Sequence, residues 1–208
     1  MKRPSAVKVH VPGVLARLKE RIRGREQKLV RGGWQMPLLL LVYPRGAGAV
    51  ASELEHAYAH ALPASGSEVR GLYGDLWRAL PALIVVQLRE RNPCGCLGHH
   101  HPPGTESRLA RRLASELGHP VAEIDLAYES IRAWQPEPLA SLAAEEAAGR
   151  LEPLRLRAAL LAVLLHEMEH LAFPERSESE ILHRSRTFYR RAMSELVGKE
   201  LGKDYGIA

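Results

Sequence analysis

Apolar residues along this chain gather in short runs whose spacing alternates between strand-like and helix-like. Met36–Tyr43 and Leu83–Leu88 are short, almost continuously apolar runs and predict buried strands. Val50–Leu62 and Glu106–Leu117 read as helices, and Val121–Trp134 reads as a strand with apolar residues at alternate positions. Together with a helical C-terminal third, these elements predict an α+β fold in which a small sheet packs on helices.

The C-terminal third begins its helical pattern with a strongly apolar segment. Leu156–Leu165 contains one charged residue and is built from strong helix formers, so it predicts a buried helix. Pro174 ends that helix, and Ser177 is placed to cap a second helix from about Glu178 to about Leu196.

The sequence His166-Glu167-Met168-Glu169-His170 continues the buried helix and carries the clearest chemical signal. Four-residue spacing turns His166 and His170 to one helix face, where both can bind a Zn²⁺ ion, and Glu167 can reach a water on that ion. An unpaired charge on a buried helix costs several kcal/mol, and a metal satisfies such groups together. The structural alternative is a helix that reaches the surface near residue 166 and has a polar end.

A zinc site needs a third protein ligand, and the second helix supplies candidates. In order of preference they are Glu178, Glu180 and His183. Glu178 lies on the inward stripe of the second helix, three residues before Ile181. Glu180 lies on a polar face and completes a capping box with Ser177, in which its carboxylate bonds back to the helix start. The alternative for Glu178 is an ordinary first-turn acid, favoured by the helix dipole.

The segment from His166 to Glu178 resembles the compact zincin-like peptidases of the gluzincin kind, in which an HExxH helix turns sharply into a second helix with a glutamate ligand. The resemblance extends over about residues 155–196. It implies His166, His170 and Glu178 as ligands of a zinc cofactor, and Glu167 as the general base in hydrolysis of a peptide or protein substrate. Three protein ligands leave one position for water, whose pKa falls toward about 7 on zinc. In such folds the strand before the active helix lines the substrate cleft, so Val121–Trp134 is expected to be that edge.

A second group of metal-binding residue types lies in a segment rich in glycine and proline. It comprises Cys94, Cys96, His99, His100 and His101. These thiols and imidazoles can hold zinc or copper. The Cys-x-Cys spacing is tighter than in most structural zinc sites and is also too close for an ordinary structural disulfide. The alternatives are a flexible polar loop, or a loop that approaches the HExxH motif and gives it a ligand or thiol.

Charge and length define two parts of the chain. Residues 1–32 hold ten Lys or Arg against two Glu, a balance of +8 within an overall +5. This basic arm predicts a helix over Val14–Val30 that docks on an acidic partner, nucleic acid or a membrane surface, or packs on the main domain through its apolar stripe. Residues 33–208 are expected to form one domain. The chain shows no transmembrane segment and no signal peptide, which favours the cytoplasm, and nothing in it specifies an oligomeric state.

Two hypotheses for function follow. The first is a zinc metallopeptidase, and the second is a non-catalytic metal-binding interaction protein whose basic arm contacts nucleic acid or a protein partner. They differ at Glu167. An enzyme needs this carboxylate beside an open metal position, whereas a structural site fills the fourth position with another Cys or His, such as one from residues 94–101.

Overall fold

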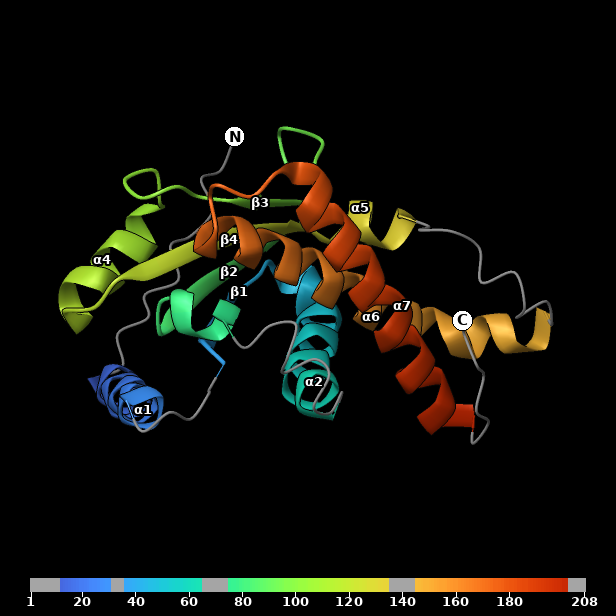
Figure 1. The fold of residues 1–208 in the computed structure, drawn as a ribbon, viewed down its shortest axis with the longest axis horizontal. Helices are drawn as coiled ribbons and strands as arrows, with labels where there is room; N and C mark the ends of the chain where they lie inside the picture. The colour runs from blue at the N-terminus through green and yellow to red at the C-terminus, as the bar shows by residue number, and fades with distance from the viewer. Residues whose placement is uncertain (1–11, 31–35, 65–74, 135–144, 202–208) are drawn as a thin grey trace.

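A four-stranded sheet lies between two layers of helices in the computed structural model, which describes residues 12–30, 36–64, 75–134 and 145–201 (Figure 1). The strand order is β1-β2-β4-β3, where β1, β2 and β4 run parallel and β3 is antiparallel to β4. The strands are β1 (Leu38–Val42), β2 (Leu83–Arg89), β3 (Gly98–His100) and β4 (Val121–Ala127). The helices are α1 (Pro12–Val30), α2 (Gly48–Ala64), α4 (Arg108–Leu117), α5 (Tyr128–Ala133), α6 (Glu145–Ala172) and α7 (Glu178–Leu201), with a 3-10 turn η1 (Arg45–Ala47) before α2. The architecture is α+β, as the sequence pattern predicts.

Side chains of β2 alternate between two apolar cores. Ile84 and Val86 pack with residues of α2, α5, α6 and α7 on one face of the sheet. Leu83 and Val85 pack with residues of α1 and α4 on the other face. A strand buried on both faces has a continuously apolar sequence, which explains why β2 is recognisable as a strand.

The helix α6 forms the centre of the larger core. Its segment from Ala158 to Leu165 is buried on every side, because the sheet, α2 and α7 surround it. Helix α7 follows after a short turn and packs along α6, as Figure 1 shows. The predicted buried helix and the predicted second helix are therefore both confirmed.

The predicted strand Val121–Trp134 is only partly correct. Strand β4 ends at Ala127, and α5 follows at once with Glu129 in its first turn, where a carboxylate favours helix formation. Moreover, β4 lies between β2 and β3, so the prediction that it is the edge beside the active helix is wrong. The edge strand beside α6 is β3, which belongs to residues 94–101, the Cys/His segment.

The basic helix α1 packs on the face of the sheet opposite α6. Ile22 is 0% exposed and contacts the smaller core. Arg25 is also buried and donates to the backbone oxygens of Trp77 and Leu80. Exposed basic residues lie elsewhere on the helix, at Arg17, Lys19, Arg21 and Arg23. The apolar stripe of α1 thus packs on the main domain, while residues 1–11 and 31–32 of the basic arm lie outside the described residues.

Among the residues that the structure describes, no helix is both long enough and apolar enough to cross a membrane.

Candidate metal centre

The end of α6 and the start of α7 bring three potential metal ligands together. His166 and His170 lie one turn apart on α6, with their Nε2 atoms 3.2 Å from each other. The Glu178 carboxylate reaches both rings, with Oε2 2.9 Å from Nε2 of His170 and Oε1 3.3 Å from Nε2 of His166. One ligand atom from each residue lies within 4.8 Å of the others. The structure therefore assembles the preferred ligand set.

Glu178 takes this position because of how the chain turns between the helices. The Phe173 amide donates to the Glu169 carbonyl at 2.8 Å, and Pro174 follows, which cannot continue the helix. The turn is short, so the first residue of α7 lies beside the last turn of α6. Although the Glu178 side chain is 67% exposed, its oxygens face the two imidazoles.

The two alternative ligands lie away from this group. The Glu180 carboxylate accepts from the backbone N–H of Ser177 at 3.0 Å and from its hydroxyl at 2.8 Å, which confirms the capping box. These hydrogen bonds with Ser177 lower the pKa of Glu180. The His183 side chain is exposed on α7 and is not among the converging ligands. Of the three candidate third ligands, only Glu178 lies beside both histidines.

The buried carboxylate of Glu169 forms ion pairs that hold the turn in place, and these were not predicted from the sequence. Glu169 is 1% exposed and accepts from Nη1 of Arg176 at 3.2 Å and from Nε of Arg184 at 2.9 Å. The three residues join α6, the turn and α7. A carboxylate on a buried helix needs a partner, so the two arginines downstream were the available signal.

The position of the Ser185 hydroxyl favours one tautomer of His166. The Ser185 hydroxyl donates to the Leu182 carbonyl at 3.0 Å, so an oxygen lone pair remains to accept from Nδ1 of His166 at 3.5 Å. Burial lowers the pKa of His166, which favours the neutral ring. Nε2 then presents its lone pair to His170 and Glu178. Two imidazole nitrogens and a carboxylate that converge in this way fit a zinc ion, which takes such N and O ligands.

Glu167 is not part of the ligand group and points from α6 toward the edge strand. It is 6% exposed, and its Oε2 accepts from the backbone N–H of His100 at 3.1 Å and lies 3.1 Å from Nδ1 of the same residue. A Cβ atom at Gly98 would lie 2.6 Å from Oε1 of Glu167 and 2.8 Å from Cγ1 of Val163. Glycine at this position therefore allows β3 to lie directly against α6.

The three consecutive histidines divide between the two faces of β3. His100 faces α6, where its ring stacks on that of His170 at 5.0 Å between centroids and 15° between planes. His99 lies opposite Asp125 in the β3–β4 ladder, and its side chain is on the other face of the strand. Nε2 of His101 lies 3.3 Å from Oδ2 of Asp125. The hypothesis that this segment approaches the HExxH motif is thus confirmed, but among the described residues it adds no fourth ligand atom to the His166, His170 and Glu178 group.

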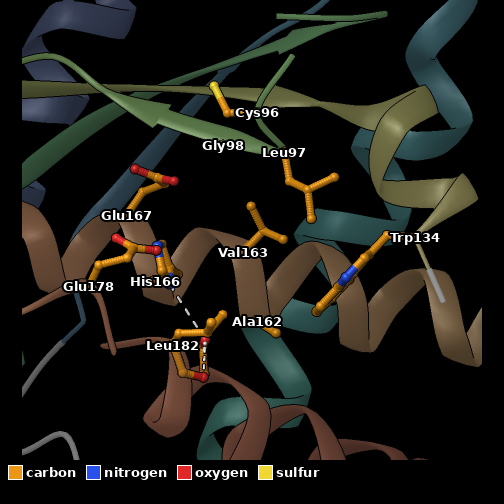
Figure 2. A pocket seen from close by; sticks show the side chains of 11 residues that line it. Cys96, Leu97, Gly98, Trp134, Ala162, Val163, His166, Glu167, Glu178 and Leu182 are labelled. Carbon is orange, nitrogen blue, oxygen red and sulfur yellow. Dashed lines mark hydrogen bonds and ion pairs between the residues drawn. The ribbon is translucent and has the colours of Figure 1, made fainter. Parts of the chain in front are cut away.

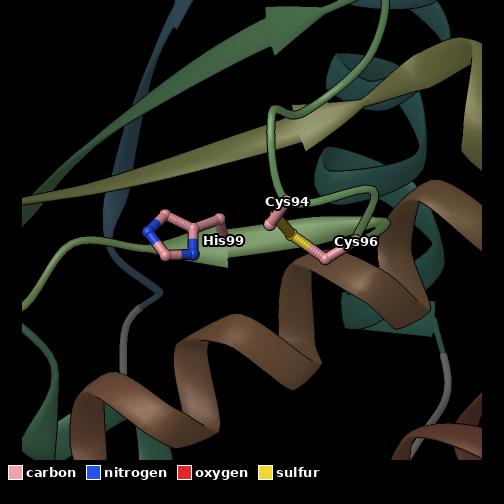
Figure 3. Close-up of side chains that lie close together, drawn as sticks. All are labelled: Cys94, Cys96 and His99. Atoms are coloured by element: carbon pink, nitrogen blue, oxygen red, sulfur yellow. A yellow bond between two sulfur atoms is a disulfide. The ribbon is translucent and has the colours of Figure 1, made fainter.

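Cys94 and Cys96 form a disulfide, so the expectation of no bridge at this spacing is wrong. Gly95 between them adopts φ +73°, which is accessible to glycine at little cost, and this turn brings the two Cα atoms to 5.3 Å. The sulfurs and a ring nitrogen of His99 form a second group within 4.8 Å (Figure 3).

A cavity of about 200 Å³ adjoins the first group and was not predicted. Figure 2 shows His166, Glu167 and Glu178 on one side of it and the apolar side chains of Leu97 and Trp134 on the other. The cavity therefore joins the candidate metal ligands to a space for an apolar group.

The chain was also compared with known proteins. No protein-family model, curated protein or solved structure matches it.

Proposed function

We propose that this protein is a zinc-dependent peptidase. The observation that carries the proposal is the convergence of His166, His170 and Glu178 beside the buried carboxylate of Glu167. The three ligands leave one position of a tetrahedral ion open, as in catalytic rather than structural zinc sites. Neighbouring residues support the ligands: Ser185 orients His166, and the Glu169 ion pair holds the turn that places Glu178.

Glu167 is the proposed general base. Bound zinc supplies a Lewis acid that polarises a carbonyl group and makes water more acidic. Glu167 accepts the proton of the attacking water and returns it to the leaving amine. Both contacts from His100 go to Oε2 of Glu167, so Oε1, which lies against Gly98, is the oxygen proposed for this transfer. The backbone N–H of His100 fixes the carboxylate in this orientation.

The proposed substrate is an extended peptide segment. The cavity of about 200 Å³ is smaller than pockets that enclose whole drug-sized ligands, which span about 300–1,000 Å³, so it suits one side chain of a longer substrate. Its lining by Leu97, Val163, Trp134 and Leu182 favours an apolar side chain. Strand β3 is the outermost strand beside α6, and an edge strand can align a peptide by main-chain pairing.

The alternative, a non-catalytic metal-binding interaction protein, needs a filled fourth metal position. None of the described residues brings a fourth Cys, His, Asp or Glu ligand atom into the first group. His100, the nearest histidine of the Cys/His segment, contacts Glu167 instead. The arrangement therefore favours catalysis.

Glu167→Gln tests the proposal. The amide oxygen can still accept from the His100 N–H, but the side chain no longer takes a proton, so we expect zinc to stay bound and turnover to fall by at least about 100-fold. Cleavage of a mixed peptide library, followed by mass spectrometry, measures turnover without a known substrate. Glu175→Gln, in the exposed turn, is the matched control and should leave cleavage unchanged. Unchanged cleavage in Glu167→Gln, or loss of its zinc, contradicts the assigned role.

A further inference from the structure

His99, in the second group of potential ligands, lies on the side of β3 that faces away from α6, while Cys96 of that group also lines the cavity beside the first group. Gly98 and His100 face α6, whereas His99, at the intervening position, faces the opposite side. The sulfurs of Cys94 and Cys96 lie within 4.8 Å of a His99 ring nitrogen (Figure 3). Two sulfurs and one imidazole are the donor types that bind zinc, and this group shares no residue with the first.

The loop holds this geometry by contacts other than the disulfide. The Gly95 amide donates to the Asn92 carbonyl at 3.0 Å and closes the turn. Asn92 is 5% exposed, and its Nδ2 donates to the Cys96 carbonyl at 3.2 Å. His99 is fixed separately, by the pairing of β3 with β4. The three donor residues therefore stay close together when the sulfurs are no longer bonded to each other.

Asn92 also contacts a sulfur directly. Its Nδ2 lies 3.9 Å from Sγ of Cys96 and acts as a hydrogen-bond donor to that atom. A donor of this kind stabilises a thiolate more than a thiol, because the hydrogen bond is stronger to the charged form. Thiolate is the form that binds metals. The buried amide thus favours the ligand state of Cys96.

We propose that Cys94, Cys96 and His99 form a second zinc site that exists only when the cysteine pair is reduced. In the disulfide each sulfur is bonded to the other, and the pair offers no thiolate. An external dithiol reduces it by exchange: the S–S bond of Cys94 and Cys96 breaks, the dithiol becomes a disulfide, and its two protons pass to the two cysteine thiols. Zinc then binds both sulfurs as thiolates and releases these protons, and water completes the coordination.

The position of the pair permits this exchange. Cys94 is exposed and Cys96 is half-buried, so a reductant can reach a sulfur. The second group shares no residue with the first, although Cys96 also lines the cavity beside it, so the two zinc sites are independent in their ligands. Oxidised protein is expected to bind metal only at the first group, and reduced protein at both.

Cobalt titration of the full chain tests the proposal. Co²⁺ replaces Zn²⁺ and shows a thiolate-to-cobalt charge-transfer absorption only when sulfur is a ligand. Metal-free protein reduced with a water-soluble phosphine, without oxygen, should develop this absorption and bind about one more equivalent of Co²⁺ than the oxidised protein. The phosphine takes the oxygen of a water molecule as the disulfide becomes two thiols. Absence of the absorption from reduced protein that is folded by circular dichroism overturns the proposal.

Variants separate this site from the proposed peptidase site. His166→Ala/His170→Ala should retain the charge-transfer absorption, and Cys94→Ser/Cys96→Ser should lose it while keeping metal at the first group. Failure of the peptidase proposal therefore leaves this result unchanged. Loss of the absorption in the histidine variant would instead place the thiolates at the first group and contradict a separate site.

A matched pair of histidines tests the third ligand. His99→Ala should weaken Co²⁺ binding to the reduced thiols by at least about tenfold. Loss of a residue that only supports a metal ligand already weakens binding by about this factor, so loss of a ligand should weaken it at least as much. His101→Ala is the control, because His101 lies on the same side of the strand and contacts Asp125 but is not in the ligand group. Equal affinity in His99→Ala and wild type, or a larger loss in His101→Ala, rejects His99 as a ligand.

Discussion

The two groups of potential metal ligands differ in what holds their donor atoms. His166, His170 and Glu178 are carried by two helices of the larger core, and a buried ion pair fixes the turn between those helices. Cys94, Cys96 and His99 come from a loop and a three-residue strand at the edge of the sheet. The helical donors cannot bond to one another covalently, whereas the two sulfurs do. The proposed first site is therefore available in either redox state, whereas the proposed second site depends on reduction of the two sulfurs.

Their surroundings differ as well, and this difference bears on function. Glu167 lies beside the first group, and a cavity lined by apolar side chains adjoins it. The second group has exposed Cys94 and His99. A buried acid next to an open metal position suits catalysis, while an exposed thiol pair suits reversible exchange. The edge strand β3 contacts both regions, because His99 belongs to the second group and His100, on the other face, contacts Glu167.

The largest expected effect concerns the ligand that the second helix gives to the first group. Glu178→Ala removes a proposed direct ligand and should weaken zinc binding by more than about 100-fold. That factor is the largest usually seen when a residue that only supports a ligand is removed, and loss of a ligand should exceed it. Glu180→Ala removes only the capping carboxylate and should leave zinc affinity unchanged. Competition with a chromogenic chelator measures both affinities. The opposite order would show that Glu178 is an ordinary first-turn acid.

A second prediction concerns the contact between β3 and α6. Gly98→Ala places a methyl group against Glu167 and Val163, so the strand or the carboxylate must move. We expect a loss of about 1–3 kcal/mol in the free energy of unfolding and reduced turnover with zinc retained. Gly46→Ala is the control, since a Cβ there meets nothing within 4 Å. Urea denaturation and peptide cleavage measure the two effects, and wild-type behaviour of Gly98→Ala would refute the close contact.

A smaller effect is expected where Ser185 supports His166. Ser185→Ala removes the oxygen that accepts from Nδ1, so the ring is no longer held in the metal-binding tautomer. Zinc affinity should fall by about tenfold. Ser52→Ala, on the exposed face of α2, provides the control. If Ser185→Ala binds zinc as tightly as the wild type, the hydroxyl has no part in orienting the ring.

The smallest effect is a pH dependence of the α7 cap. The pKa of Glu180 is lowered in the folded protein by its hydrogen bonds to Ser177, so the carboxylate stabilises the fold above its ordinary pKa. That contribution is lost as the pH falls from the ordinary pKa through the lowered one. Wild type should therefore melt above Glu180→Gln at about pH 7, and the difference between the two melting temperatures should shrink as the pH falls below the ordinary pKa of glutamate. A difference that persists in acid contradicts a charge-dependent cap.

Regions with regular apolar spacing could be predicted from the sequence. The strands β1 and β2 and the helices α6 and α7 follow local patterns of this kind. Glu178 could be preferred to Glu180 as the residue beside the histidines, because helix geometry fixes which residues share a face. The four-residue spacing in the HExxH motif likewise predicted that His166 and His170 lie on one face of α6.

The edge strand could not be predicted, because its identity depends on partners distant in the chain. Gly98, His99 and His100 show no apolar alternation, and β3 forms through pairing with β4. The opposed directions of His99 and His100 follow only once that pairing is known. The disulfide depends likewise on the conformation of Gly95, which spacing alone does not specify.

Zinc content, measured by elemental analysis of the oxidised protein, tests the central claim most directly. We predict about one zinc per chain in the wild type and in Cys94→Ser/Cys96→Ser, and none in His166→Ala/His170→Ala. The same protein samples, checked by circular dichroism, show whether each variant is folded. Zinc that remains in the folded histidine variant would contradict a metal centre at His166, His170 and Glu178.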